Sequence, residues 1–423
     1  MSTKSSTTTE TPDRRSVFSW AMYDWANSAY AASVMVVFAP ILFTGIWAAE
    51  LGKTDSTFRW GVISSITSAI IAVLAPLLGA VADRCGRRKG LLLTFAFIGA
   101  TATIGLSFIA HGHWQLAAVV YIISGIGFSG ANVFYDSLLV SVAPASARDR
   151  VSALGYALGY LGGGLMLAAH VFLVLRHDSF HLTEVEAQRV CIITAALWWI
   201  LFCIPLWRGV RETAVPHTGI AEAVRRSFGE VVGTVRQLRQ HRPVLIFLLA
   251  YWLYIDGVDT IIRMAVPYGK NIGVSDADLI KAILLTQFIA FPAALVFGRL
   301  GERLGTRRSI LLAIGCYIAI TGWAASMKAA WEFYVLAAAV GLVQGGIQSL
   351  SRSMYSRLIP PEKASEYFGL YNLLGKSAAV LGPLMMGWIA VVTDNDRVGI
   401  LSILVLFIAG GALLLQVRED AQQ

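Results

Sequence analysis

The sequence predicts an all-α membrane protein whose twelve transmembrane helices form two pseudo-symmetric six-helix bundles. Three observations carry this prediction: an apolar composition, twelve long apolar runs, and a basic motif that occurs once in each half of the chain. Hydrophobic residues make up 56% of the 423 residues and charged residues 14%, with a mean hydropathy of +0.65. This balance excludes a soluble protein.

Each of the twelve apolar runs is long enough for a helix to cross about 30 Å of hydrocarbon. They lie at 17–47, 60–82, 90–110, 114–137, 150–175, 190–207, 244–267, 279–300, 309–327, 331–354, 366–390 and 398–417. A longer polar segment separates the sixth run from the seventh, so the chain contains two sets of six. The predicted parts are a disordered cytoplasmic tail at 1–16, an N-terminal bundle at 17–207, a cytoplasmic linker at 208–243, a C-terminal bundle at 244–417 and a cytoplasmic tail at 418–423.

Lysine and arginine are distributed unevenly between the two ends of these runs. If the N-terminus is cytoplasmic, the cytoplasmic segments hold 23 of the 34 cations and the external loops hold 8. Short cytoplasmic loops collect cations in this way, so both termini and the linker are predicted to be cytoplasmic. The same sorting indicates that the net charge of +8 reflects membrane orientation and not nucleic-acid binding.

The linker contains a predicted amphipathic helix at 221–240. Its apolar residues recur at roughly helical spacing, and four arginines lie among them: Arg225, Arg226, Arg236 and Arg239. A basic helix with one apolar face lies in the membrane interface, so we expect this helix on the inner leaflet.

A basic motif joins the second run to the third and recurs between the eighth and ninth. The first copy, residues 79–89, reads GAVADRCGRRK, and the second, residues 298–308, reads GRLGERLGTRR. The acid, the arginine after it and the following glycine match, as do two cations near the end. A further set of glycines, a serine and a proline repeats at an offset of 216 residues. The two halves are therefore parallel repeats of one six-helix unit.

The motif resembles the signature between the second and third spans of the major facilitator superfamily. The resemblance implies the major facilitator fold, transport by alternating access, and gating roles for the motif residues of both copies. These residues are Asp83, Arg84, Gly86, Arg87, Arg88, Glu302 and Arg303. In that superfamily the loop acid faces the start of the eleventh helix, which implies that Asp83 lies near Ser365.

Seven ionisable side chains fall inside the apolar runs, where they are costly and therefore candidates for function. They are Asp24, Asp136, Asp256, Asp259, Arg263, Arg352 and Lys376. Asp136 and Arg352 occupy equivalent positions in the two halves, so they can bridge the halves as a gate on the cytoplasmic side. The alternative is that each reaches water at the membrane surface. Asp256 and Lys376 lie at similar depth, and we expect each to pair with the other or with a charge of the substrate.

Polar residues also recur at every third or fourth position in three runs, which gives each helix a polar stripe. The stripes and the charges beside them supply the predicted substrate-binding residues: Asp24, Asn27, Tyr30, Tyr254, Asp256, Asp259, Gln344, Gln348, Asn372 and Lys376. A carboxylate and an ammonium in one cavity can bind both ends of a zwitterion. A proton is a candidate coupling ion, carried by one of the acids.

Within the superfamily, six stretches resemble the branch of the autophagy-related vacuolar effluxers of fungi and their bacterial homologues. They are residues 23–28, 134–137, 152–155, 253–257, 344–352 and 368–376. The resemblance implies an amino-acid substrate. One departure is Asp136, because many facilitators have an arginine in the fourth span, so their inner ion pair does not carry over unchanged. The fungal proteins have longer loops, and the compact chain implies a bacterial protein of the plasma membrane.

The function expected from the sequence is secondary-active transport of small polar solutes, amino acids or similar zwitterions, by a monomer in the lipid bilayer. No catalytic motif or metal-ligand spacing is present, so neither an enzyme nor a cofactor is expected. Two alternatives remain: a broad-specificity drug or sugar facilitator, and a membrane receptor that transports nothing. A receptor would lack a wet central cavity, so such a cavity distinguishes the two classes.

Overall fold

The computed structural model describes residues 12–212, 219–271, 273–327, 329–378 and 381–417, and nearly all of them lie in helices. The first span of the N-terminal bundle consists of α1 (Arg14–Ala29), η1 (Tyr30–Phe38), α2 (Ala39–Leu42) and η2 (Phe43–Trp47). The rest of this bundle comprises η3 (Ala49–Leu51), α3 (Lys53–Cys85), α4 (Arg88–Leu106), α5 (Trp114–Val142), η4 (Ala145–Ala147), α6 (Arg148–Leu175), η5 (His177–Phe180) and α7 (Glu184–Gly209).

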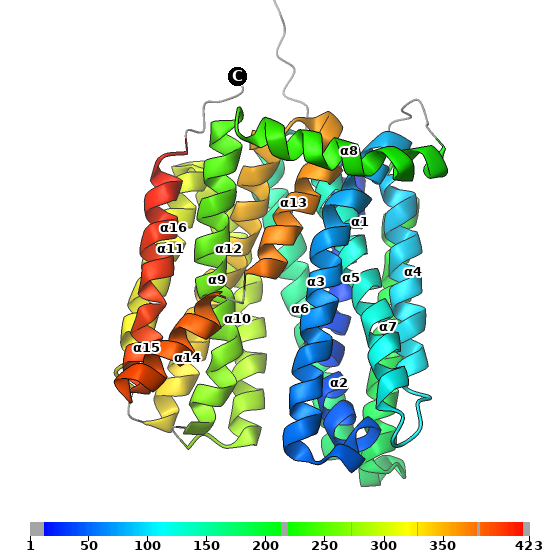
Figure 1. Cartoon of the computed structure of the whole chain (residues 1–423), viewed down its shortest axis with the longest axis vertical. Coiled ribbons are helices and arrows are strands. Elements are labelled where there is room, and N and C mark those ends of the chain that lie inside the picture. Colours follow the sequence, from blue (N-terminus) through cyan, green and yellow to red (C-terminus); the bar gives the residue numbers. More distant parts are fainter. Residues whose placement is uncertain (1–11, 213–218, 272, 328, 379–380, 418–423) are drawn as a thin grey trace, which may run out of the picture.

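The C-terminal half follows the helix α8 (Ile220–Leu238) and stands beside the N-terminal bundle (Figure 1). Its elements are α9 (Arg242–Asn271), α10 (Asp276–Leu304), α11 (Thr306–Ala324), α12 (Ala330–Leu358), η6 (Pro361–Lys363), α13 (Ala364–Ser377), α14 (Leu381–Thr393), α15 (Asp396–Ser402) and α16 (Leu404–Leu415).

Eleven of the described segments are long and apolar enough to cross a membrane. The remaining span, α11, has 19 residues and carries Arg307 and Arg308 in its first turn. Pairs of short helices form the eleventh span (α13 and α14) and the twelfth (α15 and α16). The predicted all-α fold with twelve spans in two six-helix bundles is therefore confirmed, and the chain is a multi-pass membrane protein.

The matched glycines of the two motif copies share a structural cause. Gly86 ends α3 with φ +60°, and Gly305 ends α10 with φ +90°. Positive φ values are strained for residues with a Cβ, so glycine suits both turns. Each turn reverses the chain within one or two residues and leaves the basic side chains of the motif at the same end of the molecule. We call this the basic end.

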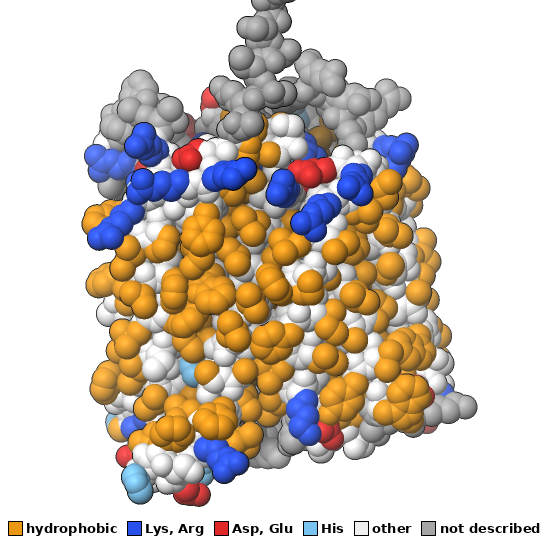
Figure 2. Space-filling view, turned by 180° about the vertical axis from the view of Figure 1, so that it is seen from behind, with side chains coloured by type: hydrophobic (Ala, Val, Ile, Leu, Met, Phe, Trp, Pro, Cys, Tyr) orange, Lys and Arg blue, Asp and Glu red, His pale blue; other side chains and the backbone are white. Residues whose placement is uncertain are grey.

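The linker helix α8 lies across the basic end, roughly perpendicular to the spans (Figure 1). Ala223 packs against Val81 and Cys85 of α3, and Glu230 forms an ion pair with Arg84. Exposed lysines and arginines form a band at this end, above a broad apolar belt (Figure 2). The belt has the side-chain chemistry of a lipid-facing surface.

The eleventh span differs from the predicted continuous helix at 366–390. It is divided into α13 and α14, and Ala378 after α13 has an extended ψ of 177°. Asp256 on α9 accepts a hydrogen bond from the backbone nitrogen of Gly382 at 2.9 Å. A carboxylate that receives an N-terminal amide stabilises the start of a helix, so Asp256 supports the second half of this broken span.

Candidate functional site

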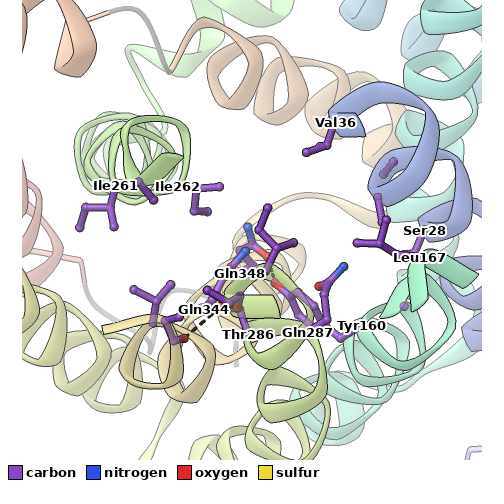
Figure 3. Close-up of a pocket in the computed structure, with 18 of the residues that line it drawn as sticks. Ser28, Val36, Tyr160, Leu167, Ile261, Ile262, Thr286, Gln287, Gln344 and Gln348 are labelled. Carbon is purple, nitrogen blue, oxygen red and sulfur yellow. Dashed lines mark hydrogen bonds between the residues drawn. The ribbon is translucent and has the colours of Figure 1, made fainter. Parts of the chain in front are cut away.

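A cavity of about 380 Å³ lies between the two bundles (Figure 3). Its walls come from the first span, α6, α9, α10 and α12, so both halves contribute. Most of the lining is apolar, as is usual for small-molecule sites. The polar lining residues are Asp24, Ser28, Tyr156, Tyr160, Thr286, Gln287, Gln344 and Gln348.

Amide side chains form much of the polar side of this cavity. The Tyr160 hydroxyl donates to Oε1 of Gln348 at 2.6 Å, which orients the Gln348 amide (Figure 3). Gln344 lies one turn before it on α12, and Gln287 lines the cavity from α10. Amides offer both donors and acceptors, so this side can bind a carboxylate, a hydroxyl or an ammonium.

The cavity extends away from the basic end. Asp24 and Gln348 lie deepest, whereas Leu279 and Phe333 line the cavity within the first turns of α10 and α12, at the opposite end. Contacts between the two bundles close the space between Asp24 and the basic end. The structure therefore shows a conformation that is closed at the basic end.

The first of these contacts centres on one arginine of the C-terminal bundle, which is surrounded by the N-terminal bundle. Arg352 on α12 is 2% exposed. Its guanidinium donates to the Asp136 carboxylate at 3.1 Å and lies 3.5 Å from the Asp24 carboxylate. It also donates to the hydroxyl of Ser152 at 2.9 Å. The predicted contact between Asp136 and Arg352 is confirmed, and Asp24 is a second acid that the sequence did not place there.

Three aromatic rings complete the surroundings of this guanidinium. The ring centroids of Tyr156, Trp20 and Tyr135 lie 4.3, 5.0 and 5.2 Å from its central carbon. Aromatic faces attract cations, and they also exclude water, which strengthens the ion pairs. Because two carboxylates share one arginine, withdrawal of Arg352 would leave two neighbouring acids in need of another cation.

A second contact joins α3 to the start of α13. Asp83 accepts hydrogen bonds from the backbone nitrogens of Ser365 at 3.0 Å and Glu366 at 2.8 Å. Arg88 forms an ion pair with the same carboxylate at 2.7 Å. The predicted position of Asp83 near Ser365 is confirmed. A carboxylate at a helix N-terminus is stabilised by the helix dipole and by unpaired amide groups.

A third contact joins α6 to the start of α11 and to α12. Asp149, in the first turn of α6, accepts a hydrogen bond from the Thr306 hydroxyl at 2.8 Å and forms an ion pair with Arg357 at 2.9 Å. Its side chain is 2% exposed. Asp149 and Arg357 were missed by the sequence analysis, because both fall outside or at the ends of the apolar runs, where charges are common.

Three of the ten predicted substrate-binding residues line the cavity: Asp24, Gln344 and Gln348. Four others form hydrogen bonds between helices: Asn27 with Asn132, Tyr30 with Ser124, Tyr254 with Ser351, and Asn372 with Asp136. Polar residues at helical spacing thus also hold spans together. Among the polar lining residues that the sequence analysis missed, Gln287 had a detectable signal, because it is an isolated amide in an apolar run.

The predicted pair of Asp256 and Lys376 is not formed in this conformation. Besides the hydrogen bond from the Gly382 nitrogen, the Asp256 carboxylate accepts a hydrogen bond from the Thr260 hydroxyl at 3.3 Å. The Lys376 ammonium lies 5.8 Å from the ring centroid of Phe128 and has no ion pair within 4 Å among the described residues. Similar depth on two helices did not bring the charges together, because the Asp256 carboxylate binds the start of α14, whereas Lys376 lies in the last turn of α13, beside Phe128. Asp259 is half-buried one turn after Asp256.

The predicted gating residues of the motif differ in what they contact. Asp83 and Arg88 act at the contact between α3 and α13, and Gly86 ends α3. Arg84 instead forms its ion pair with Glu230 on α8. The side chains that remain exposed are Arg87, Glu302 and Arg303.

A cavity between two six-helix bundles, closed at one end by contacts across them, is the arrangement of a membrane transporter of the major facilitator fold. The human organic anion transporter MFSD10 (TETRAN) matches with a TM-score of 0.72 and 16% identity, over 96% of this chain and 100% of that one. The proton:xylose symporter XylE matches with a TM-score of 0.70 and 13% identity, over 96% and 94%. At these identities the likeness shows the fold alone.

The sequence comparisons identify the family. The family described as vacuole effluxer Atg22 like matches residues 60–422, and the chain belongs to it. YxiO of Bacillus subtilis (strain 168), an uncharacterized MFS-type transporter, is 37% identical over 95% of this chain and 94% of its own. Autophagy-related protein 22 of Yarrowia lipolytica is 25% identical over 90% and 78%. The family resemblance read from six stretches is confirmed, and the protein is a membrane transporter.

Proposed function

We propose that the protein exports small zwitterionic solutes, amino acids above all, by proton-coupled alternating access across a bacterial plasma membrane. The observation that carries this proposal is the place of Asp24. Its carboxylate lines the cavity and also lies 3.5 Å from Arg352 in the contact that closes the basic end. One acid therefore faces both the ligand space and the gate. The family's description as effluxers supports the direction.

The cavity suits an amino acid with an apolar side chain. The ammonium would bind Asp24, the carboxylate would accept hydrogen bonds from the amides of Gln344 and Gln348, and the side chain would contact the aliphatic wall that includes Val36 and Leu336. Hydrogen bonds to charged groups contribute about 1.5–3 kcal/mol each. In this proposal the glutamines take the role that the sequence analysis gave to Lys376.

Coupling follows from the sharing of Arg352 by two acids. A proton or a ligand ammonium on Asp24 removes one of the two negative charges that hold Arg352. The contact at the basic end then weakens, and the balance shifts toward a conformation open at that end. The Tyr135 hydroxyl donates to Asp24 at 2.8 Å, so the acid keeps one fixed partner through this change.

Purified protein in proteoliposomes tests the substrate class. We expect exchange of labelled neutral amino acids, accelerated by a proton gradient and lowered at least tenfold in Asp24→Asn. The proposal fails if the wild-type protein, folded by its thermal unfolding profile, exchanges no amino acid in a mixture of all twenty. Matched assays with a hexose and a lipophilic cation identify the alternative substrates.

A sugar carrier is the second candidate, favoured by the three glutamines and Tyr160 in the cavity. Amides and hydroxyls bind sugar hydroxyls without any charge on the ligand. The Asp24→Asn variant separates the two proposals, because a neutral sugar should still bind to it, whereas a zwitterion should lose most of its affinity.

Orientation can be tested with two single cysteines. Ser146 lies at the basic end, between α5 and α6, and Ser179 lies at the opposite end, between α6 and α7; both are exposed. With the basic end in the cytoplasm, an impermeant thiol reagent should label Ser179→Cys in intact cells and Ser146→Cys only after permeabilisation. Labelling of both in intact cells would contradict this topology.

A further inference from the structure

A second cavity, of about 570 Å³, lies at the basic end, outside the central one. It is lined by α1 and α6 of the N-terminal bundle and by α10 of the C-terminal bundle. Three arginines line it, one on each helix: Arg14, Arg150 and Arg299. Apolar side chains form the rest of the wall, among them Phe18, Leu154 and Leu295.

The three arginines are exposed, and none forms an ion pair or side-chain hydrogen bond with any described residue. This differs from Arg84, Arg88 and Arg357 at the same end, each of which has a carboxylate partner. The single acid of the lining, Glu302, is exposed and forms no ion pair within the described part of the chain. The cavity therefore carries an excess of two positive charges beside an apolar wall.

We propose that this cavity binds an anionic phospholipid of the adjoining leaflet. Its phosphate would lie between the three arginines, and an acyl chain would follow the wall formed by Phe18, Leu154 and Leu295. The position supports this source, because the band of cations lies directly above the apolar belt, at the level of lipid headgroups (Figure 2). Arginine donates paired hydrogen bonds that match a phosphate.

Binding of this lipid favours the conformation closed at the basic end. The walls come from both bundles, and α10 passes close to α6 here, since a Cβ on Gly298 would lie 2.5 Å from the Cβ of Ala153. Separation of α6 from α10 would divide the site and move Arg150 away from Arg299. A ligand that binds one conformation better than another shifts the population toward it.

Native mass spectrometry of the purified protein, released from an uncharged detergent, tests the site. The variant is Arg150→Gln/Arg299→Gln, and the matched control is Arg225→Gln/Arg308→Gln, which removes two exposed cations of the same end outside the cavity. Each arginine contributes about 1 kcal/mol to binding of anionic lipid, so we expect roughly 25-fold weaker retention of phosphatidylglycerol by the variant. The control should lose less than about threefold, and phosphatidylcholine should be retained equally weakly by all three proteins.

Equal retention of phosphatidylglycerol by the variant and the control would overturn the proposal. Retention of glycerol 3-phosphate or inorganic phosphate at the lipid's affinity would also overturn it, because the apolar wall would then contribute nothing. None of these measurements depends on the transported substrate.

Discussion

The two copies of the basic motif meet the opposite bundle at the same end of the molecule, but with different charges. In the first copy the loop acid itself makes the contact, because Asp83 accepts hydrogen bonds from the first amides of α13. In the second copy the loop acid, Glu302, is exposed. The contact there uses Asp149 on the opposing helix α6, with Thr306 and Arg357 as partners. In the first copy the acid of the contact belongs to the motif, whereas in the second copy it belongs to the opposing helix α6.

The glycines did not move. A Cβ on Gly79 would collide with the carbonyl oxygen of Ser365, and a Cβ on Gly298 would lie 2.5 Å from the Cβ of Ala153. We call the contact of Asp83 with the start of α13 the first joint, and the contact of Asp149 with Thr306 and Arg357 the second joint. Both joints therefore need glycine, which has no Cβ, at the point where the helices cross. The comparison teaches that the repeat preserves helix packing, whereas the charges that lock each joint can be redistributed among neighbours.

The largest expected effect is at the second joint. Arg357→Gln leaves Asp149, which is 2% exposed, without its ion-pair partner. Loss of one partner of a buried pair costs about 3–5 kcal/mol, and the low end applies because the Arg357 side chain is 29% exposed. We expect a clear fall in the thermal unfolding midpoint of the detergent-solubilised protein.

The control for this prediction is Asp149→Asn/Arg357→Gln, which leaves no unpaired charge and should recover most of the lost stability. If the single variant unfolds at the wild-type temperature, the second joint does not depend on the ion pair, and the comparison between the joints loses its basis.

Asp83→Asn at the first joint should act on conformation more than on stability. The negative charge at the start of α13 contributes about 0.3–1 kcal/mol through the helix dipole, so its removal should raise the population open at the basic end about two- to fivefold. Spin labels at Ser146→Cys and Glu362→Cys, exposed residues of opposite bundles, report this opening as a longer distance. An unchanged distance distribution together with normal transport would contradict the gate role of Asp83.

A smaller effect is expected from the residue that matches Asp83 in the second copy. Glu302→Gln changes an exposed side chain with no ion pair in the described part of the chain, so its stability should stay within about 0.5 kcal/mol of wild type. The spin-label distances should also be unchanged. An opening as large as that of Asp83→Asn would show that the two motif copies work alike and that the structural difference between them has no consequence.

The sequence predicted the fold well because the fold depends on local patterns, whereas the position of Asp83 near the start of α13 was predicted only from the resemblance to the superfamily. Apolar runs, a basic turn and the matched glycines each have a direct structural cause. The cavity was predicted less well, since polar residues such as Asn27 and Tyr254 bond to neighbouring helices, and a polar stripe does not say which helix it faces. The pair of Asp256 and Lys376 was predicted wrongly for another reason: the Asp256 carboxylate is bound by the backbone nitrogen of Gly382 at the start of α14, a tertiary contact that no local pattern reveals.

The smallest predicted effect concerns the start of α1, beside the second joint. The Asp13 carboxylate accepts hydrogen bonds from the Ser16 hydroxyl at 2.8 Å and from the backbone nitrogen of Arg15 at 3.1 Å, and these lower the pKa of Asp13 below its usual value. A carboxyl whose pKa is lower in the folded protein stabilises the helix start above its unfolded pKa of about 3.9 and loses that effect as the pH falls below it. Amide hydrogen exchange of Arg15 and Ser16, corrected for the intrinsic rate, should therefore lose protection as the pH falls below about 4. Asp13→Asn is the matched control, because asparagine caps helices as well as aspartate does but does not titrate. If amide protection in Asp13→Asn falls with pH as much as in the wild type, the loss of protection originates in the contacts that close the basic end and not in the helix cap.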